Sequence, residues 1–305
     1  MRLLRESHSF RRRACALLVL APLASIASGA CKKGDDSTSK AHPTEAGARD
    51  FGGICDDGTK CRTFPTSGEA FNAVLVEGPR VLAIGESHAP AGSATPATIR
   101  RFQEELLPIL AGKASAMVLE LWVGAPRCQA AVTAVATKQK EVTKTQAASN
   151  PNAYFDLGTA AKALGIFPLP LTPTCDDYAS IVDAGPSDID AMLRLIRKLT
   201  AASVRTRLEK SPEKMVVAYG GLLHNDLAPR KGMEAWSFGN ELSDATAGKY
   251  VELDLVTPEF IEDSDTWKRL PWFSAFHRER QGGETVLIEP SPKSYVLIFS
   301  RGQKN

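Results

Sequence analysis

The sequence lacks the short signatures of several large enzyme classes. It contains no Gly-x-Ser-x-Gly elbow, no His-Glu-x-x-His zinc helix, no Walker phosphate loop and no dinucleotide-binding glycine fingerprint. It also contains no internal repeat. These absences exclude the corresponding hydrolases, metalloproteases and nucleotide-binding enzymes, so any chemistry has to come from residues that the fold brings together.

An excess of charge of one sign is also missing. Of the 37 Lys and Arg and the 35 Asp and Glu, residues 1–30 hold five arginines and one glutamate, which leaves 32 basic and 34 acidic residues and a net charge of −2. Basic and acidic residues are interspersed, and no aromatic–basic stripe occurs. We therefore expect no nucleic-acid partner.

The apolar run near the start of the chain, Ala14 to Ile26, is too short to span a bilayer stably. It follows a segment with five arginines and precedes the small residues Ala27-Ser28-Gly29-Ala30. This order is typical of an export signal. Residues 1–30 are therefore predicted to be a signal peptide that is removed.

Cys31 directly follows these small residues, and this arrangement resembles the lipobox of bacterial lipoproteins, in which that cysteine is diacylated. Ser28 stands where leucine is usual, so an ordinary secretory signal is the alternative. Lys32 is not the aspartate that favours inner-membrane retention in lipoproteins. We expect an acyl anchor on Cys31, worth roughly 0.8 kcal/mol per buried methylene. The predicted location is the bacterial cell envelope, at the outer membrane facing the periplasm or the exterior.

Cysteine is scarce, and its spacing does not resemble a zinc cluster. Without Cys15 and the acylated Cys31, four cysteines remain, and an even number in an exported chain predicts two disulfides. Three pairings are open, one of which joins the nearest neighbours: Cys55 with Cys61, and Cys128 with Cys175. Free buried thiols are the alternative.

Large apolar residues are almost absent from residues 31–50, which are rich in Lys, Asp, Ser, Thr, Gly and Pro. Such a segment cannot form a core, so it is predicted to be a flexible tether. Residues 51–305 suit one large α/β domain. We expect a central, mostly parallel sheet flanked by helices, with antiparallel strands near the C-terminus.

Three solid apolar runs predict buried strands of this sheet: residues 80–84, 116–119 and 214–219, and residues 165–171 are a fourth candidate. Helical spacing predicts helices over residues 98–110, 127–148, 157–164 and 187–208. Residues 250–256 alternate between apolar and polar, which favours a strand at a sheet edge with one wetter face. Residues 285–289 and 294–300 are expected to form a hairpin.

Two matching tetrapeptides, Gly85-Glu86-Ser87-His88 and Gly221-Leu222-Leu223-His224, end two of the predicted strands. Glycine allows a tight turn there, and ligands of open α/β sheets bind above the carboxyl ends of the strands. Glu120 ends a third strand. We therefore expect Glu86, His88, Glu120 and His224 to share one crevice, with Asn225 and Asp226 orienting His224 or capping the next turn.

Two chemistries fit this set. His88, Glu120 and His224 are suitable ligands for a divalent Zn, Mn or Fe ion with an open position for water. Without metal, the same residues can provide a histidine general base oriented by a carboxylate. As single residues, each also has a purely structural explanation, such as a helix cap or a hydrogen-bonded strand end.

The strand followed by Gly-Glu-x-His, the strand ending in Leu-Glu and the later strand followed by Gly-x-x-His resemble the Tiki/ChaN/erythromycin-esterase superfamily over residues 74–256. That superfamily includes haem- or iron-linked ChaN-like lipoproteins, metal-dependent proteases and metal-independent macrolide esterases. The resemblance implies catalytic roles for Glu86, His88, Glu120 and His224. It also implies an arginine on the preceding helix, for which Arg194, Arg197, Arg205 and Arg207 compete.

The function expected from these observations is that of a lipid-anchored hydrolase, metal-dependent or acid/base, acting on a small-molecule or peptide ligand. The alternative is an uptake lipoprotein that binds haem or iron without catalysis. A third alternative is a surface lipoprotein that retains the site without using it.

Overall fold

The three solid apolar runs form neighbouring strands at the centre of one sheet. The structure is a computed structural model that describes residues 53–56, 58–124 and 126–302. In it, β5 (Met215–Gly221) lies between β2 (Val81–Glu86) and β3 (Ala114–Trp122), and both pairings are parallel. The predicted signal peptide, the predicted tether and Cys31 lie outside the described residues.

Five further strands complete an eight-stranded sheet in the order β1-β7-β8-β6-β2-β5-β3-β4. The strands from β8 to β4 run parallel, whereas β7 is antiparallel to both β8 and β1. The additional strands are β1 (Cys61–Phe64), β4 (Phe167–Leu171), β6 (Tyr250–Val256), β7 (Thr285–Ser291) and β8 (Ser294–Ile298). The fold is thus the predicted single α/β domain with a mostly parallel sheet and antiparallel strands near the C-terminus.

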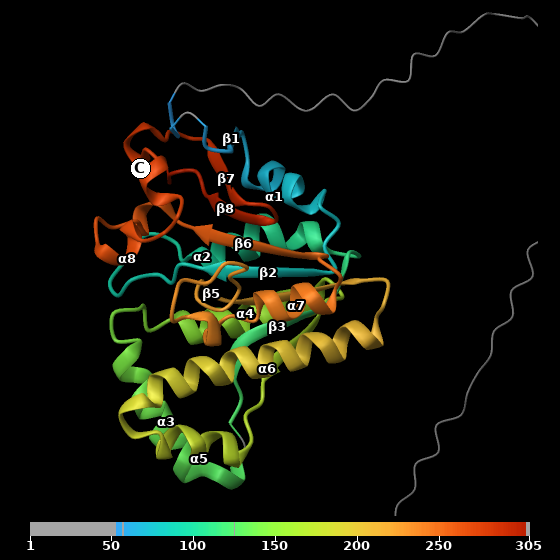
Figure 1. The fold of residues 1–305 in the computed structure, drawn as a ribbon, viewed down its shortest axis with the longest axis vertical. Coiled ribbons are helices and arrows are strands. Elements are labelled where there is room, and N and C mark those ends of the chain that lie inside the picture. Colours follow the sequence, from blue (N-terminus) through green and yellow to red (C-terminus); the bar gives the residue numbers. More distant parts are fainter. Residues whose placement is uncertain (1–52, 57, 125, 303–305) are drawn as a thin grey trace, which may run out of the picture. The chain divides into compact units, whose positions relative to one another are not determined.

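Helices cover both faces of the sheet (Figure 1). One face carries α6 (Asp188–Lys210) and α7 (Gly239–Ala245), and the other carries α1 (Ser67–Leu75), α2 (Thr98–Arg101) and α4 (Asn150–Ala163). Beyond β4, α3 (Gln129–Val142) packs on α5 (Cys175–Asp183), and α8 (Asp265–Lys268) lies near the C-terminal strands. Among the described residues, no helix has both the length and the apolar character needed to cross a membrane.

Side chains alternate between the two faces along each strand, and this creates two separate cores. Leu82 and Ile84 of β2 enter the core under α1, α2 and α4, whereas Val81 and Ala83 enter the core under α6 and α7. The outermost helices α3 and α5 build a smaller cluster of their own around Tyr178.

The structure confirms the prediction of two disulfides. They join Cys55 to Cys61 and Cys128 to Cys175, which is the nearest-neighbour pairing. The second bond links the start of α3 to the first residue of α5, so it fastens these two outer helices together.

The expectation that β6 is a wet edge strand was wrong. All seven residues of β6 are buried, and the strand pairs with β2 on one side and β8 on the other. Its polar residues, Glu252 and Asp254, face a buried loop rather than water. The alternation of apolar and polar residues in β6 therefore reflects polar side chains that form buried hydrogen bonds, and not a face exposed to water.

Helix boundaries also differ from the prediction. The expected helix over residues 98–110 consists of α2, a π-helical turn at Phe102–Leu106 and a 3₁₀ turn at Leu107–Leu110. Pro108 lies in that last turn, and its missing N–H does not support a continued α-helix. The helix expected over 127–148 is shorter, and the one expected over 157–164 begins already at Asn150.

Candidate functional site

The parallel centre of the sheet positions the four predicted side chains. Glu86 is the last residue of β2, and His88 follows two residues later. Glu120 lies near the end of β3, and His224 follows the end of β5 by three residues. Because β5 pairs with both β2 and β3, the three strand ends open onto one edge of the sheet.

Glu86 holds His88 in a fixed orientation. The His88 Nδ1–H donates to Glu86 Oε1 at 3.0 Å, and the hydroxyl of Tyr219 donates to Glu86 Oε2 at 2.8 Å. Glu86 is buried, whereas the side chain of His88 is 25% exposed. The carboxylate therefore directs the other ring nitrogen of His88, Nε2, away from Glu86.

Electrostatics favour the protonated forms of the groups around Glu86. Burial opposes a charge on His88, but the hydrogen bond to Glu86 and the charges of Glu86 and Glu120 outweigh it and raise the pKa of His88. Burial, followed by the charge of Glu86, raises the pKa of Tyr154 and Tyr219 well above the usual value. Both phenols therefore stay neutral, which keeps Tyr219 a hydrogen-bond donor.

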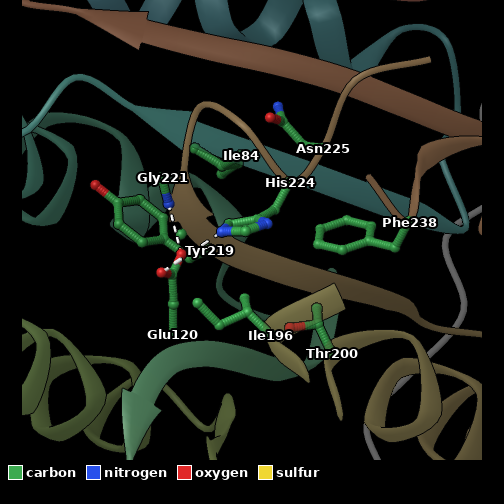
Figure 2. Close-up of a pocket in the computed structure, with 10 residues that line it drawn as sticks. Ile84, Glu120, Ile196, Thr200, Tyr219, Gly221, His224, Asn225 and Phe238 are labelled. Carbon is green, nitrogen blue, oxygen red and sulfur yellow. Dashed lines mark hydrogen bonds and ion pairs between the residues drawn. The ribbon is translucent and has the colours of Figure 1, made fainter. Parts of the chain in front are cut away.

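Glu120 lies between β5 and His224. Its Oε2 accepts a hydrogen bond from the backbone N–H of Gly221 at 2.8 Å, and its Oε1 lies 3.8 Å from Nε2 of His224. The second distance is too long for a direct hydrogen bond. Figure 2 shows His224 and Glu120 facing each other across this gap.

A backbone carbonyl fixes the orientation of the His224 ring. Its Nδ1 lies 2.9 Å from the carbonyl oxygen of Trp236, and because a carbonyl only accepts, Nδ1 carries the hydrogen. The Nε2 of a neutral His224 therefore presents a lone pair toward Glu120. Arg197 of α6 supports this loop by donating to the carbonyl of Ser237 at 3.0 Å.

Gly221 lets the two halves of the site approach each other. A Cβ at this position would lie 3.2 Å from Nε2 of His88 and 3.8 Å from Oε2 of Glu120. Because glycine has no side chain, the imidazole of His88 and the carboxylate of Glu120 can both lie close to Gly221.

A small cavity adjoins the site. Its walls are Glu120, His224, Asn225 and Gly221 together with apolar side chains, among them Ile84, Ile196, Tyr219 and Phe238 (Figure 2). The cavity measures about 10 Å³, which is close to the space that one water molecule requires. Water next to Glu120 and His224 would have polar partners on one side and apolar walls on the other.

The three predicted metal ligands, His88, Glu120 and His224, are of the types that bind a divalent ion, but they lie too far apart to bind one together. Two imidazoles and a carboxylate are typical ligands of Zn, Mn or Fe. In the structure, however, no choice of one ligand atom each from His88, Glu120 and His224 places all three within 4.8 Å of one another. The described geometry is therefore not a closed coordination sphere.

A second polar cluster was missed in the sequence. Among the described residues, Asp226, Glu252 and Asp254 are the group of possible metal ligands whose atoms all lie within 4.8 Å of one another. The alternation of residues 250–256 predicted a face exposed to solvent, so Glu252 and Asp254 were not recognised as buried. The signal available in the sequence was the position of Asp226, only two residues after His224.

Burial governs the protonation of this second cluster. Burial raises the pKa of Asp226 to about 6 despite the opposing charges of Arg230 and His224. Burial and the charge of Asp226 raise the pKa of Glu252 to about 7, against the hydrogen bond from the Leu227 N–H. The pKa of Asp254 is raised as well, first by burial and then by its two carboxylate neighbours.

The candidate arginines of α6 all have partners away from the four predicted residues. Arg194 pairs with Asp190 at 2.7 Å, Arg197 and Arg205 pair with Glu241, and Arg207 donates to the carbonyl of Ser115. Of these, Arg197 contacts the loop of His224 directly, because it binds the residue after Trp236. Arg194 reaches the same loop through Asp190, which accepts from the Trp236 Nε1–H at 2.8 Å. The contact of Arg197 supports the loop that carries His224.

No protein-family model, no curated protein and no solved structure matches this chain. The resemblance to the Tiki/ChaN/erythromycin-esterase superfamily therefore stays a prediction, carried by the short motifs of residues 74–256. The roles of individual residues have to be argued from the geometry of the site.

Proposed function

We propose that the chain is a hydrolytic enzyme whose centre consists of Glu86, His88, Glu120 and His224. One observation carries this proposal: each histidine has its Nδ1 tied to an oxygen acceptor, Glu86 for His88 and the Trp236 carbonyl for His224. This leaves both Nε2 atoms on the side of Glu120 and Gly221. An oriented imidazole with a free nitrogen is the usual form of a general base.

The contacts of each residue determine the role that we propose for it. His88, oriented by Glu86, exchanges a proton through Nε2 with a water molecule or with the leaving group of the substrate. Glu120 and His224 hold this water molecule beside the cavity that they line, and Glu120 accepts the hydrogen bond from its second hydrogen. Tyr219 fixes the carboxyl group of Glu86 in place by donating to it. This arrangement suits a small-molecule or peptide substrate that reaches the exposed edge of His88.

The metal-dependent alternative is favoured by the tautomer of His224. Metal-binding histidines commonly donate their second nitrogen to a carbonyl or a carboxylate, as His224 and His88 both do. His88, Glu120 and His224 would hold the ion, and a bound ion supplies an acidified water. The spacing of the three ligands argues against it, so the acid/base form is our first proposal.

Metal content and hydrolysis together decide between these forms. The purified protein and a variant with His88→Ala and His224→Ala are compared for bound Zn, Mn and Fe by mass spectrometry, and for turnover of a panel of activated esters and peptides. We expect turnover to be lost in the variant with no difference in metal content. Stoichiometric metal that disappears in the variant would establish the metal form instead.

A matched histidine outside the site controls for indirect effects. His277 pairs with Asp56 at 2.7 Å and is not among the residues that line the cavity beside Glu120 and His224. His277→Ala is expected to retain full turnover. Equal losses in His277→Ala and His88→Ala would rule out the proposed centre.

Haem or iron uptake without turnover is tested separately. Haem is titrated into the purified protein while the Soret absorbance is followed. A Soret shift that disappears in the variant lacking His88 and His224, combined with no turnover of any substrate, would replace the hydrolase by the uptake function.

We also propose that the protein is exported and anchored in the cell envelope through Cys31. Two disulfides support export, because such bonds persist in oxidising compartments. The predicted anchor places the site at a membrane surface, facing the periplasm or the exterior. Its test is the lipidation experiment described in the Discussion.

A further inference from the structure

Three carboxylates meet beneath the loop that connects β5 to α7. Glu252 and Asp254 come from the same face of β6, and Asp226 comes from the loop. Their ligand atoms all lie within 4.8 Å of one another, and Glu252 and Asp254 are only 6% and 8% exposed. Like charges this close repel strongly unless protons or a cation neutralise them.

The protein provides little positive charge for this cluster. Arg230 and His224 face it through Asp226. Within the described part of the chain, neither Glu252 nor Asp254 forms an ion pair. Glu252 accepts from the Leu227 N–H at 2.6 Å and from the Ser294 hydroxyl at 2.8 Å, which leaves lone pairs of both its oxygens free.

Asn225 supplies an independent sign of a ligand. Its residue is 1% exposed, its Nδ2 donates to Asp254 Oδ1 at 2.9 Å, and its Oδ1 has no hydrogen-bond partner in the described part of the chain. Both this oxygen and Asp254 Oδ1 lie over the α-carbon of Gly85, 2.7 and 2.8 Å from where a Cβ would be. A buried amide oxygen without a donor is costly, so this one points to a missing positive partner.

We propose that Asp226, Glu252, Asp254 and the Oδ1 of Asn225 form a calcium-binding site. Four oxygen ligands without nitrogen or sulfur suit a hard cation. The ligand atoms of the three carboxylates lie within 4.8 Å of one another, near enough for one ion to contact all three. Ca²⁺ accepts about six to eight carboxylate, amide and water oxygens in flexible geometry. Mg²⁺ instead keeps several of its waters and is seldom held by protein ligands alone. The free lone pairs of the carboxylates and water complete the coordination.

The bound ion fastens the loop of His224 to the sheet. Asn225 and Asp226 come from the loop, whereas Glu252 and Asp254 come from β6, so one ion joins both. The hydroxyl of Tyr250 already donates to the carbonyl of Asn225 at 2.6 Å, and Ser237 donates to the carbonyl of Asp226 at 2.6 Å. The calcium site therefore differs in ligands and position from the group formed by His88, Glu120 and His224.

The test measures thermal unfolding of the purified full-length protein, stripped with EDTA, as Ca²⁺ is added up to about 10 mM, roughly tenfold above the weakest Kd of extracellular calcium modules. We expect the unfolding temperature to rise with Ca²⁺, because an ion that binds only the folded state stabilises it. Titration calorimetry should give one Ca²⁺ per chain. The same titration with Mg²⁺ should give a weaker response.

Variants of the same size without the carboxylate charge test which residues bind Ca²⁺. Asp254→Asn should weaken Ca²⁺ binding roughly tenfold or more, while unfolding in EDTA at a temperature no lower than wild type, because a repelled charge has been removed. Glu252→Gln provides the same readout if Asp254→Asn does not fold. Glu120→Gln, a carboxylate change in the other site, should leave Ca²⁺ binding unchanged.

Three results would overturn the calcium site: no Ca²⁺ response of the wild-type protein, an equal response in Asp254→Asn and Glu252→Gln, or a Mg²⁺ response as strong as that to Ca²⁺. None of them bears on hydrolysis, so the proposed function stands or falls independently.

Discussion

Nε2 of His224 lies 3.8 Å from Oε1 of Glu120, close enough to share a partner and too far for a direct hydrogen bond. The two residues come from different strand ends, β5 and β3, and neither is near the other in sequence. A water molecule between them would have a hydrogen-bond acceptor on each side, Nε2 of His224 and the carboxylate of Glu120. This separation is the geometric basis of the proposed water site.

Gly221→Ala should disable the centre without unfolding the protein. The new Cβ would lie 3.2 Å from Nε2 of His88, so the imidazole must move. We expect turnover to fall by roughly tenfold or more, as small displacements of catalytic groups do. Gly283→Ala is the matched control, because a Cβ there meets nothing within 4 Å. Steady-state kinetics that are equal in both variants would contradict the role of Gly221.

Tyr219→Phe should lower kcat with little change in KM. The substitution removes the hydroxyl that donates to Glu86 at 2.8 Å and leaves the aromatic packing in place. Loss of this hydrogen bond is expected to cost about 1 kcal/mol in the free energy of unfolding. Denaturant unfolding and steady-state kinetics check the two effects separately. A variant with wild-type kcat would show that Tyr219 is only a packing residue.

Removing the two disulfides should have unequal effects on stability. Cys128 and Cys175 are separated by 47 residues, and Cys55 and Cys61 by six. In the chain-entropy description, the longer loop corresponds to about 4 kcal/mol and the shorter to about 2 kcal/mol. Paired Cys→Ser variants are compared by urea unfolding. A larger loss from the Cys55–Cys61 pair would contradict the loop-length argument.

Asp177 should stabilise α5 in a pH-dependent way. Thr174 and Asp177 form a capping box at the helix start, and Lys198 pairs with Asp177 at 3.0 Å. Burial opposes ionisation, but these hydrogen bonds outweigh it and lower the pKa of Asp177. A lowered pKa means that the stabilisation is present above the unfolded pKa of about 3.9 and is lost as the pH falls further.

The measurement for Asp177 is urea unfolding of wild type and Asp177→Asn across pH. The difference in stability should be constant from about pH 7 to 5 and shrink below about pH 4. Thr174→Ala should cost about 1 kcal/mol at neutral pH. A difference that grows toward low pH would have the wrong sign for this cap.

Cys31→Ser should release the protein from the membrane. Metabolic labelling with a radioactive fatty acid is expected to mark the wild-type chain and not the variant, because acylation requires the thiol. Cys15→Ser is the matched control, since that cysteine lies within the predicted signal peptide. A wild-type chain that takes up no label would leave the ordinary secretory signal as the explanation.

The central strands and the strand-end residues were predictable because their signals are local. Solid apolar runs identified β2, β3 and β5, and the turn after each run identified Glu86, His88 and His224. Parallel strands align their ends at the same edge, so convergence of these residues follows from topology alone.

The parts that were not predicted depend on distant contacts. β6 looked like an edge strand because Glu252 and Asp254 resemble solvent-facing residues until the loop with Asn225 covers them. β1 is only four residues long, and nothing local in residues 61–64 specifies its partner. The Trp236 carbonyl that orients His224 is a backbone atom, which leaves no signature in a side-chain pattern.

The pairing of β1 with β7 has a consequence for the order of folding. Cys61 lies opposite Ile288, so the first and the last part of the folded chain meet in the sheet, and β8 must also reach its place beside β6. Contacts so remote in sequence form slowly and late. A chain that emerges from its N-terminus would have to hold its central strands with one side of the sheet unfinished until residues 285–298 are free. Truncation before Thr285 should therefore leave an open strand edge and an aggregating product.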